Sequence, residues 1–252
     1  MHVSAMHIPD GFINAPVSAL AWAIAIAGLA LCIWGARRQL DEKTAPLAGL
    51  IAVFVFAMQM LNFPVAAGTS GHLLGGALAA ILVGPYAGAL AVSVVILVQG
   101  LLFADGGLSA MGLNIINMGL VTAVAGWFVF RLVVRLAGTS RPAVLTGAFL
   151  AGLIAVPVSA LAFVLEYAIG GTGTINLTTV LVAMTGVHVL IGLGEGIITA
   201  LTVGAVYLAR PDLVYGVHDR TRADLEIRSA PAGGSAAGST SQGSAAPGTQ
   251  GG

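Results

Sequence analysis

Seven apolar stretches, separated by short polar loops, fill most of the first 208 residues of this chain. They lie at residues 16–35, 45–63, 72–83, 86–103, 113–130, 143–168 and 180–208. A helix needs ~20 apolar residues to cross a hydrocarbon core of ~30 Å, and most of these stretches approach or exceed that length. Strand-like alternation is absent, which favours a helical bundle over a β-barrel. The stretches therefore predict an all-α membrane protein with about seven transmembrane helices.

The composition agrees with this class of protein. Hydrophobic residues make up 58% of the 252 residues and charged residues only 8%, which excludes an ordinary soluble domain. The stretch at 72–83 is too short to span a membrane alone, so we expect it to be tilted, re-entrant or completed by neighbouring protein. We divide the chain into an N-terminal loop at 1–15, a transmembrane domain at 16–209 and a cytoplasmic, mostly disordered tail at 210–252.

The basic residues indicate how the chain is oriented in the membrane. On the map above, all ten fall on one side: Arg37, Arg38, Lys43, Arg131, Arg135, Arg141, Arg210, Arg220, Arg222 and Arg228. Cytoplasmic loops of membrane proteins carry the excess of Lys and Arg. We therefore expect the N-terminus outside and the C-terminus in the cytoplasm.

The segment Met6-His7-Ile8-Pro9-Asp10-Gly11-Phe12 stands just before the first apolar stretch. If translation begins at Met6, the free amine, the backbone nitrogen of His7 and its imidazole can close fused chelate rings around one divalent metal ion. One more imidazole completes a planar four-nitrogen site, a geometry that suits Ni(II) or Cu(II). The proline, the Asp-Gly turn and the phenylalanine predict that the segment packs inward. We therefore interpret residues 1–15 as a metal-binding loop.

His72 is the expected fourth donor, because it lies on the same side of the membrane as the N-terminus. It follows Gly68-Thr69-Ser70-Gly71, in which the glycines permit sharp turns and Ser70 can cap a helix that begins near His72. The alternative is a capping histidine that faces water. A second outer loop contains Asp105 before two glycines, which we interpret as a turn.

Several polar residues are candidates to support the metal ligands from behind: Asp10, Gln99, Asn114, Asn117, His188 and Glu195. Asn114 and Asn117 share a helix face and are expected to bond another loop or helix. Ionisable groups in hydrocarbon cost ~2.5 kcal/mol or more, so they normally have a partner or a task. His188 and Glu195, on one helix face, could form a proton path, support a metal ligand or contact a partner subunit. Glu166 is expected to be a solvated boundary residue.

Five blocks of the sequence carry a recognisable pattern. They are Met6-His7-Ile8-Pro9-Asp10-Gly11-Phe12, Gly68-Thr69-Ser70-Gly71-His72-Leu73-Leu74-Gly75-Gly76, Leu101-Leu102-Phe103-Ala104-Asp105-Gly106-Gly107, Asn114-Ile115-Ile116-Asn117-Met118-Gly119 and His188-Val189-Leu190-Ile191-Gly192-Leu193-Gly194-Glu195-Gly196. This pattern resembles the CbiM/NikM family, the substrate-specific membrane components of energy-coupling factor (ECF) transporters for cobalt and nickel. The resemblance covers roughly residues 6–208.

The resemblance implies a seven-helix protein whose extracytoplasmic N-terminal loop inserts into the bundle. It also implies that the metal is held by the amine of the starting methionine, the backbone and side-chain nitrogens of the next histidine, and a loop histidine. In this chain those residues are Met6, His7 and His72. Because residues 1–5 precede the motif, three alternatives stay open: translation starts at Met6, the extension is removed, or Met1-His2 forms the chelate.

The implied function is uptake of Co2+ or Ni2+ across the cytoplasmic membrane of a prokaryote. The implied partners are a transmembrane coupling subunit, ATP-binding subunits and a small accessory membrane subunit, with no nucleic acid and no catalytic cofactor. The chain contains no Gly-x-x-x-x-Gly-Lys-Ser/Thr motif, so we expect the partners to hydrolyse ATP. Gly75-Gly76 with Ala79-Ala80 is expected to offer them a close-packing surface.

Two hypotheses from other classes remain. A proton-coupled secondary metal transporter would use His188 and Glu195. A membrane-embedded metalloenzyme would place His72, His188 and Glu195 around a metal with an open coordination position. The chain has no His-Glu-x-x-His motif, so the transporter subunit is favoured over an enzyme.

Overall fold

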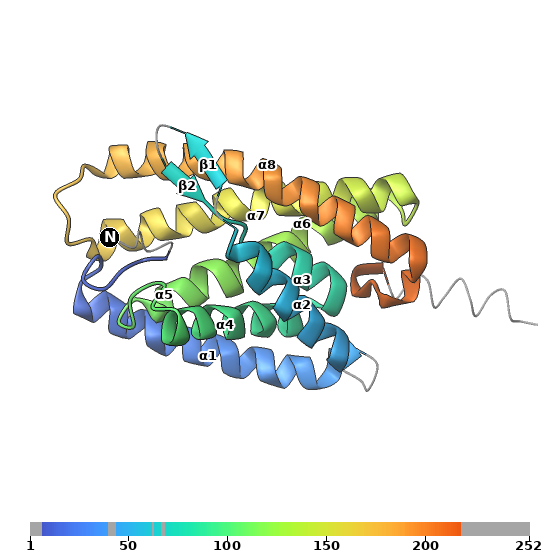
Figure 1. The fold of residues 1–252 in the computed structure, drawn as a ribbon, viewed down its shortest axis with the longest axis horizontal. Helices are drawn as coiled ribbons and strands as arrows, with labels where there is room; N and C mark the ends of the chain where they lie inside the picture. Colours follow the sequence, from blue (N-terminus) through green and yellow to red (C-terminus); the bar gives the residue numbers. More distant parts are fainter. Residues whose placement is uncertain (1–6, 40–43, 62, 67–68, 218–252) are drawn as a thin grey trace, which may run out of the picture.

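The computed structural model describes residues 7–39, 44–61, 63–66 and 69–217, and long helices lying side by side make up most of it (Figure 1). In chain order they are α1 (Ala15–Gln39), α2 (Thr44–Gln59), α3 (Gly76–Val83), α4 (Pro85–Leu102), α5 (Met111–Asn114), the π-helical segment η1 (Ile115–Val121), α6 (Thr122–Ala137), α7 (Arg141–Gly170) and α8 (Leu177–Ala209). Two antiparallel strands, β1 (Phe63–Ala66) and β2 (Thr69–Gly71), form a hairpin between α2 and α3. The short 3-10 turns η2 (Pro211–Leu213) and η3 (Tyr215–Val217) follow α8.

The predicted all-α membrane architecture is confirmed. Within the described residues, five helices are long and apolar enough to cross a membrane, and one of them runs without a break from Met111 to Ala137 through α5, η1 and α6. The helix α2 is apolar but has only 16 residues. Together with the short α3, these helices account for the seven predicted stretches.

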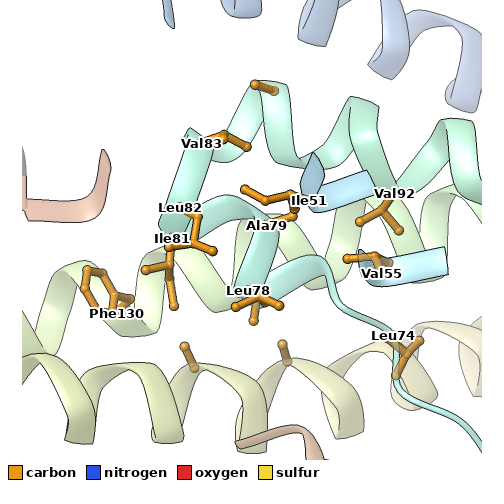
Figure 2. Packing of buried hydrophobic residues seen from close by; sticks show 14 of the residues in the cluster. Ile51, Val55, Leu74, Leu78, Ala79, Ile81, Leu82, Val83, Val92 and Phe130 are labelled. Atoms are coloured by element: carbon orange, nitrogen blue, oxygen red, sulfur yellow. The ribbon is translucent and has the colours of Figure 1, made fainter. Parts of the chain in front are cut away.

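The helix α3 lies in the middle of the bundle, and all eight of its residues are buried. Its side chains form the centre of the main apolar core, packed against α2, α4 and α6 (Figure 2). The expectation that neighbouring protein surrounds this short stretch is therefore correct. The expected partner surface at Gly75-Gly76 and Ala79-Ala80 is wrong, because these small residues face other helices of the same chain. A Cβ on Gly76, for example, would lie 3.0 Å from the backbone nitrogen of Ala123 on α6.

Two predicted boundaries change around the hairpin. The second stretch was expected to reach residue 63, but α2 ends at Gln59 and Phe63 begins β1. The residue before a proline is disfavoured in helical geometry, which explains why Phe63, before Pro64, is extended. The third stretch was expected to begin at His72, but α3 begins at Gly76. Ser70 therefore does not cap it.

The basic residues gather at one end of the bundle. Within the described residues they lie at the end of α1, in the last turns of α6, at the start of α7 and just after α8, and Figure 1 shows these helix ends together. The N-terminal segment lies at the opposite end. Val214 and Val217, in the range predicted as the tail, are fully buried against the basic end of the bundle. Residues 218–252 lie outside the described residues.

Candidate metal centre

A cavity of about 380 Å³ opens at the end of the bundle that holds the N-terminal segment. It is enclosed by residues from that segment, from the chain after β2, and from η1, α7 and α8. Its polar lining residues are His7, His72, Asn114, Asn117, Ser159 and His188. The sequence analysis selected five of these six residues, and the fold brings all five to one space.

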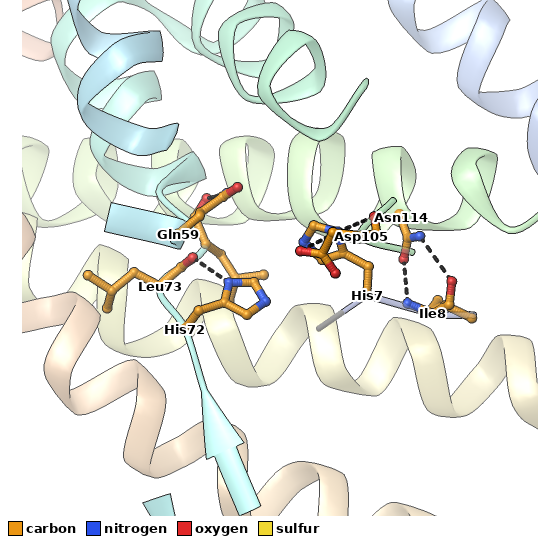
Figure 3. A network of polar contacts seen from close by, with 8 residues as sticks. His7, Ile8, Gln59, His72, Leu73, Asp105 and Asn114 are labelled. Carbon is orange, nitrogen blue, oxygen red and sulfur yellow. Dashed lines mark hydrogen bonds and ion pairs between the residues drawn. The ribbon is translucent and has the colours of Figure 1, made fainter. Parts of the chain in front are cut away.

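His7 and His72 are neighbours in this cavity. Their imidazole rings meet edge to face, with centroids 5.3 Å apart and an interplanar angle of 76°. With metal–nitrogen bonds of ~2.0 Å, two imidazoles on one ion have centroids roughly 4.5 to 6.5 Å apart. The spacing therefore suits a shared metal ion, although the two residues come from different loops (Figure 3).

The His7 ring is buried and contacts the loop between α4 and α5. Its Nδ1 lies 3.2 Å from the backbone oxygen of Asp105 and 3.7 Å from Oδ2 of the same residue. Its Nε2 is buried without a hydrogen-bond partner. Burial first, and the neighbouring His72 second, lower the pKa of His7, while the contact with Asp105 opposes them. A lowered pKa favours the neutral imidazole, which is the form that binds metal ions.

The two other histidines at the cavity have a fixed ring orientation. Nδ1 of His72 lies 2.9 Å from the backbone oxygen of Leu73, and Nδ1 of His188 lies 2.8 Å from that of Met184. A carbonyl only accepts hydrogen bonds, so Nδ1 carries the proton in both rings and Nε2 carries the lone pair. Metal-binding histidines commonly donate their second ring nitrogen in this way.

Polar contacts dock the N-terminal segment onto the loop after α4 and the end of α5. Asn114 accepts from the backbone nitrogen of Ile8 at 3.1 Å and donates to its oxygen at 3.3 Å (Figure 3). The Ile8 oxygen also accepts from Gly107 N at 2.9 Å. Asp10 Oδ1 accepts from the backbone nitrogen and the hydroxyl of Ser109, and these bonds lower the pKa of Asp10. Asp10 thus fixes the N-terminal segment to Ser109 and does not line the cavity.

Apolar contacts hold the other side of the same segment. The Phe12 ring packs on Phe163 and Tyr167 of α7, with centroids 5.9 and 5.5 Å apart. Ile13 is buried and pairs with Gly171 through a backbone bridge. The predicted inward packing is therefore confirmed for His7, Phe12 and Ile13, whereas residues 9–11 are exposed. Met6 lies outside the described residues.

The loop that contains Asp105 does more than turn the chain. The backbone nitrogens of Phe103 and Asp105 both donate to the oxygen of Gln99 at 3.1 Å, and Gly106 has a φ of 93°. A Cβ on Gly106 would lie 2.8 Å from the Cβ of His7. The contact between Asp105 and His7 was not predicted from the sequence. The available signal was the position of Asp105, before two glycines in a loop on the same side as His7.

Asn117 connects the cavity to α7. Its Nδ2 donates to Glu166 at 2.6 Å, and its backbone oxygen accepts from the Ser159 hydroxyl at 2.8 Å. The expectation that Glu166 is a solvated boundary residue is wrong, because the carboxylate is half-buried and bonded to η1. Asn117 was expected to bond another loop or helix, and its partner is Glu166 of α7.

Like Asp10, two more of the predicted supporting residues lie away from the cavity wall. Gln99 is fully buried in α4, and its backbone oxygen accepts from the Asp105 loop. Glu195 is buried in α8, where its two carboxylate oxygens accept from the backbone nitrogens of Leu74 and Gly75. Among the described residues, no three His, Cys, Asp or Glu side chains are close enough to hold a metal ion.

Known proteins are similar to this chain in sequence and in fold. The family described as "Cobalt uptake substrate-specific transmembrane region" matches residues 7–213. The chain belongs to the CbiM family. The match covers the N-terminal segment, the cavity and every transmembrane helix. CbiM proteins take up cobalt, so this chain belongs to a family of metal-uptake membrane proteins.

Named relatives of this CbiM-family chain transport nickel or cobalt. It is 43% identical over 209 residues to a putative fused nickel transport protein NikMN of Archaeoglobus fulgidus, covering 83% of this chain and 68% of the relative. It is 37% identical over 220 residues to the cobalt transport protein CbiM of Geobacter sulfurreducens, covering 83% of this chain and 62% of the relative. A solved structure described as a transition metal transporter has a TM-score of 0.73 and 26% identity, covering 86% of this chain and 98% of that one.

Proposed function

We propose that this chain captures Co2+ or Ni2+ at the outer face of the membrane as the metal-binding subunit of an ECF transporter. The observation that carries the proposal is the pair of imidazoles, His7 and His72, at 5.3 Å in one cavity at the end of the bundle away from the basic residues. The N-terminus is then outside and the C-terminus in the cytoplasm. The relatives' names, which include both metals, support the substrate class.

The proposed ligand set is the amine of Met6, the backbone and ring nitrogens of His7, and Nε2 of His72. Fused rings through the His7 backbone close only on Nδ1 of its imidazole, the nitrogen that faces Asp105. Metal binding therefore requires His7 to exchange its contact with Asp105 for the ion. Nε2 of His72 carries its lone pair and needs no such exchange.

Transport also needs a source of energy. We propose that ATP-binding subunits and a transmembrane coupling subunit supply it, with a small accessory membrane subunit. The missing phosphate-binding motif in this chain supports that assignment. Uptake of metal that persists without ATP-binding partners but collapses with an uncoupler would instead favour a proton-coupled transporter.

The test is metal binding by purified protein, with N-terminal sequencing to establish the first residue. We expect His7→Ala and His72→Ala each to lower the affinity for Ni2+ and Co2+ at least 100-fold. His218→Ala, which removes a histidine beyond the described residues, is the matched control and should bind like the parent. Full affinity in His72→Ala would overturn the proposed site.

A further inference from the structure

The four residues His72–Gly75 form a short segment without regular secondary structure, here called the strap, between β2 and α3. Leu73 and Leu74 are buried, and Gly75 has a φ of 80°, a conformation that favours glycine. The strap carries a candidate metal ligand at its first residue. Its conformation therefore determines where the His72 ring stands.

Two side chains from distant helices hold the strap by its backbone. Glu195 of α8 accepts from Leu74 N through Oε2 and from Gly75 N through Oε1, both at 2.7 Å. Gln59, the last residue of α2, donates from Nε2 to the Leu74 oxygen, also at 2.7 Å. Both backbone groups of Leu74 are thus fixed by side chains that are at most 2% exposed.

Glu195 itself rests on a rigid base. A Cβ on Gly152 of α7 would lie 2.9 Å from the backbone carbon of Glu195, and one on Gly196 would lie 2.6 Å from the Phe149 oxygen. Small residues at such positions let membrane helices approach closely. The carboxylate therefore extends from a tightly packed pair of helices, α7 and α8, to the strap.

The strap in turn fixes the His72 ring, because its Nδ1 bonds to the Leu73 oxygen within the strap. Glu195 does not line the cavity that His72 faces. Hydrogen bonds from two consecutive backbone nitrogens to one carboxyl group are strong enough to hold such a segment. Burying a carboxyl group in an apolar membrane helix costs free energy, so a residue such as Glu195 normally has a partner or a task.

We propose that Glu195, together with Gln59, is a positioning residue that sets metal affinity through His72 without touching the metal. This inference rests on the proposed function, since it requires His72 to be a ligand. Supporting residues behind metal ligands typically contribute 10–100-fold in affinity. Glu195 would do so through the backbone of the strap.

The test measures Ni2+ affinity and the absorption spectrum of bound Ni2+ in the full chain. Glu195→Gln places an amide donor against a backbone N–H donor, so we expect a 10–100-fold loss of affinity and an altered spectrum. Glu166→Gln is the matched control, because it replaces another carboxylate, half-buried on α7, that does not touch the strap, and it keeps an oxygen that can accept from Asn117. The Ni2+ affinity of Glu166→Gln should stay within about threefold of that of the parent. An unchanged affinity in Glu195→Gln would overturn the inference.

A double-mutant cycle separates positioning from general destabilisation. If Glu195 acts only through His72, Glu195→Gln should cause no further loss in a His72→Ala background. An equal loss in both backgrounds would contradict the inference, whereas full affinity in His72→Ala alone would contradict the proposed function. If Glu195→Gln does not fold, Gln59→Met gives the same comparison, because it removes the other bond to Leu74. A Gln59→Met variant with unchanged affinity would then overturn the inference.

Discussion

The His7 and His72 rings meet at 5.3 Å because each is carried by a segment that is anchored elsewhere in the fold. His7 is held by the docking of the N-terminal segment onto Asn114 and the Asp105 loop. His72 is held by the strap. The two candidate ligands therefore respond to different sets of contacts, and substitutions can move one without moving the other.

Gly106→Ala should disturb His7 selectively. The new Cβ would lie 2.8 Å from the His7 Cβ, and the backbone there has a φ of 93°. We expect Ni2+ affinity to fall at least tenfold while the helical content is kept. Gly138→Ala is the matched control, since Gly138 also has a positive φ of 80° but open space around it. Equal Ni2+ affinities in Gly106→Ala and Gly138→Ala would show that a Cβ at residue 106 does not displace His7.

Asn114→Leu should release the N-terminal segment. It removes both hydrogen bonds between Asn114 and Ile8, so the Ile8 nitrogen loses its partner and the Ile8 oxygen keeps only the bond from Gly107. We expect faster limited proteolysis near residues 7–12 and a tenfold or greater loss of Ni2+ affinity. Asn176→Leu, which removes a cap at the start of α8 instead, serves as the control for loss of an asparagine at the same end of the bundle. An unchanged cleavage pattern in Asn114→Leu would contradict the role given to these bonds.

Asp10 should make the docking of the N-terminal segment depend on pH. Its pKa is lowered from 3.8 by the bonds to Ser109, so the ionised form is favoured in the folded state. The stabilisation of the docked N-terminal segment by ionised Asp10 is therefore present above pH ~4, and it is lost as the pH falls through the lowered pKa. Hydrogen exchange of the Ser109 amide, compared between the parent and Asp10→Ala, should differ at pH 6 and converge once the pH falls below the lowered pKa of Asp10. Asp10→Asn keeps an acceptor and should lose less protection than Asp10→Ala at pH 6. Equal exchange of the parent and Asp10→Ala at pH 6 would contradict this role.

Gly196→Ala should destabilise the pairing of α7 and α8. Its Cβ would lie 2.6 Å from the Phe149 oxygen, which is backbone and cannot rotate away. Overpacking of this kind typically costs about 1–3 kcal/mol. Gly186→Ala, on the same helix with nothing within 4 Å, should be neutral. Unfolding in mixed detergent measures the free energy of unfolding of both variants. A Gly196→Ala variant as stable as Gly186→Ala would contradict the close approach of α7 and α8.

The sequence predicted the membrane architecture and most of the cavity residues because both depend on local signals. Long apolar stretches define helices, and the histidine, Asp-Gly turn and phenylalanine near the N-terminus predict a segment that packs inward. The start of α3 could not be predicted in this way. The chain from His72 to Gly75 stays outside the helix, and its backbone is bonded by Gln59 of α2 and by Glu195 of α8, which is about 120 residues away in sequence.

The role of Glu166 was missed for a related reason. Hydropathy places a carboxylate near the end of α7 but does not reveal that Asn117 of η1 faces it. Asp105 likewise has the sequence context of a simple turn. Its contact with His7 exists only because the N-terminal segment folds back onto the loop after α4.

The burial of α3 has a consequence for biosynthesis. This short helix cannot be stable in lipid alone, and the carboxylate that bonds the strap before it comes from α8. A nascent chain that has not yet produced α8 therefore lacks the group that orders His72. Full metal affinity should therefore arise only once α8 has been synthesised, so shorter nascent chains are expected to bind metal ions about 10–100-fold more weakly.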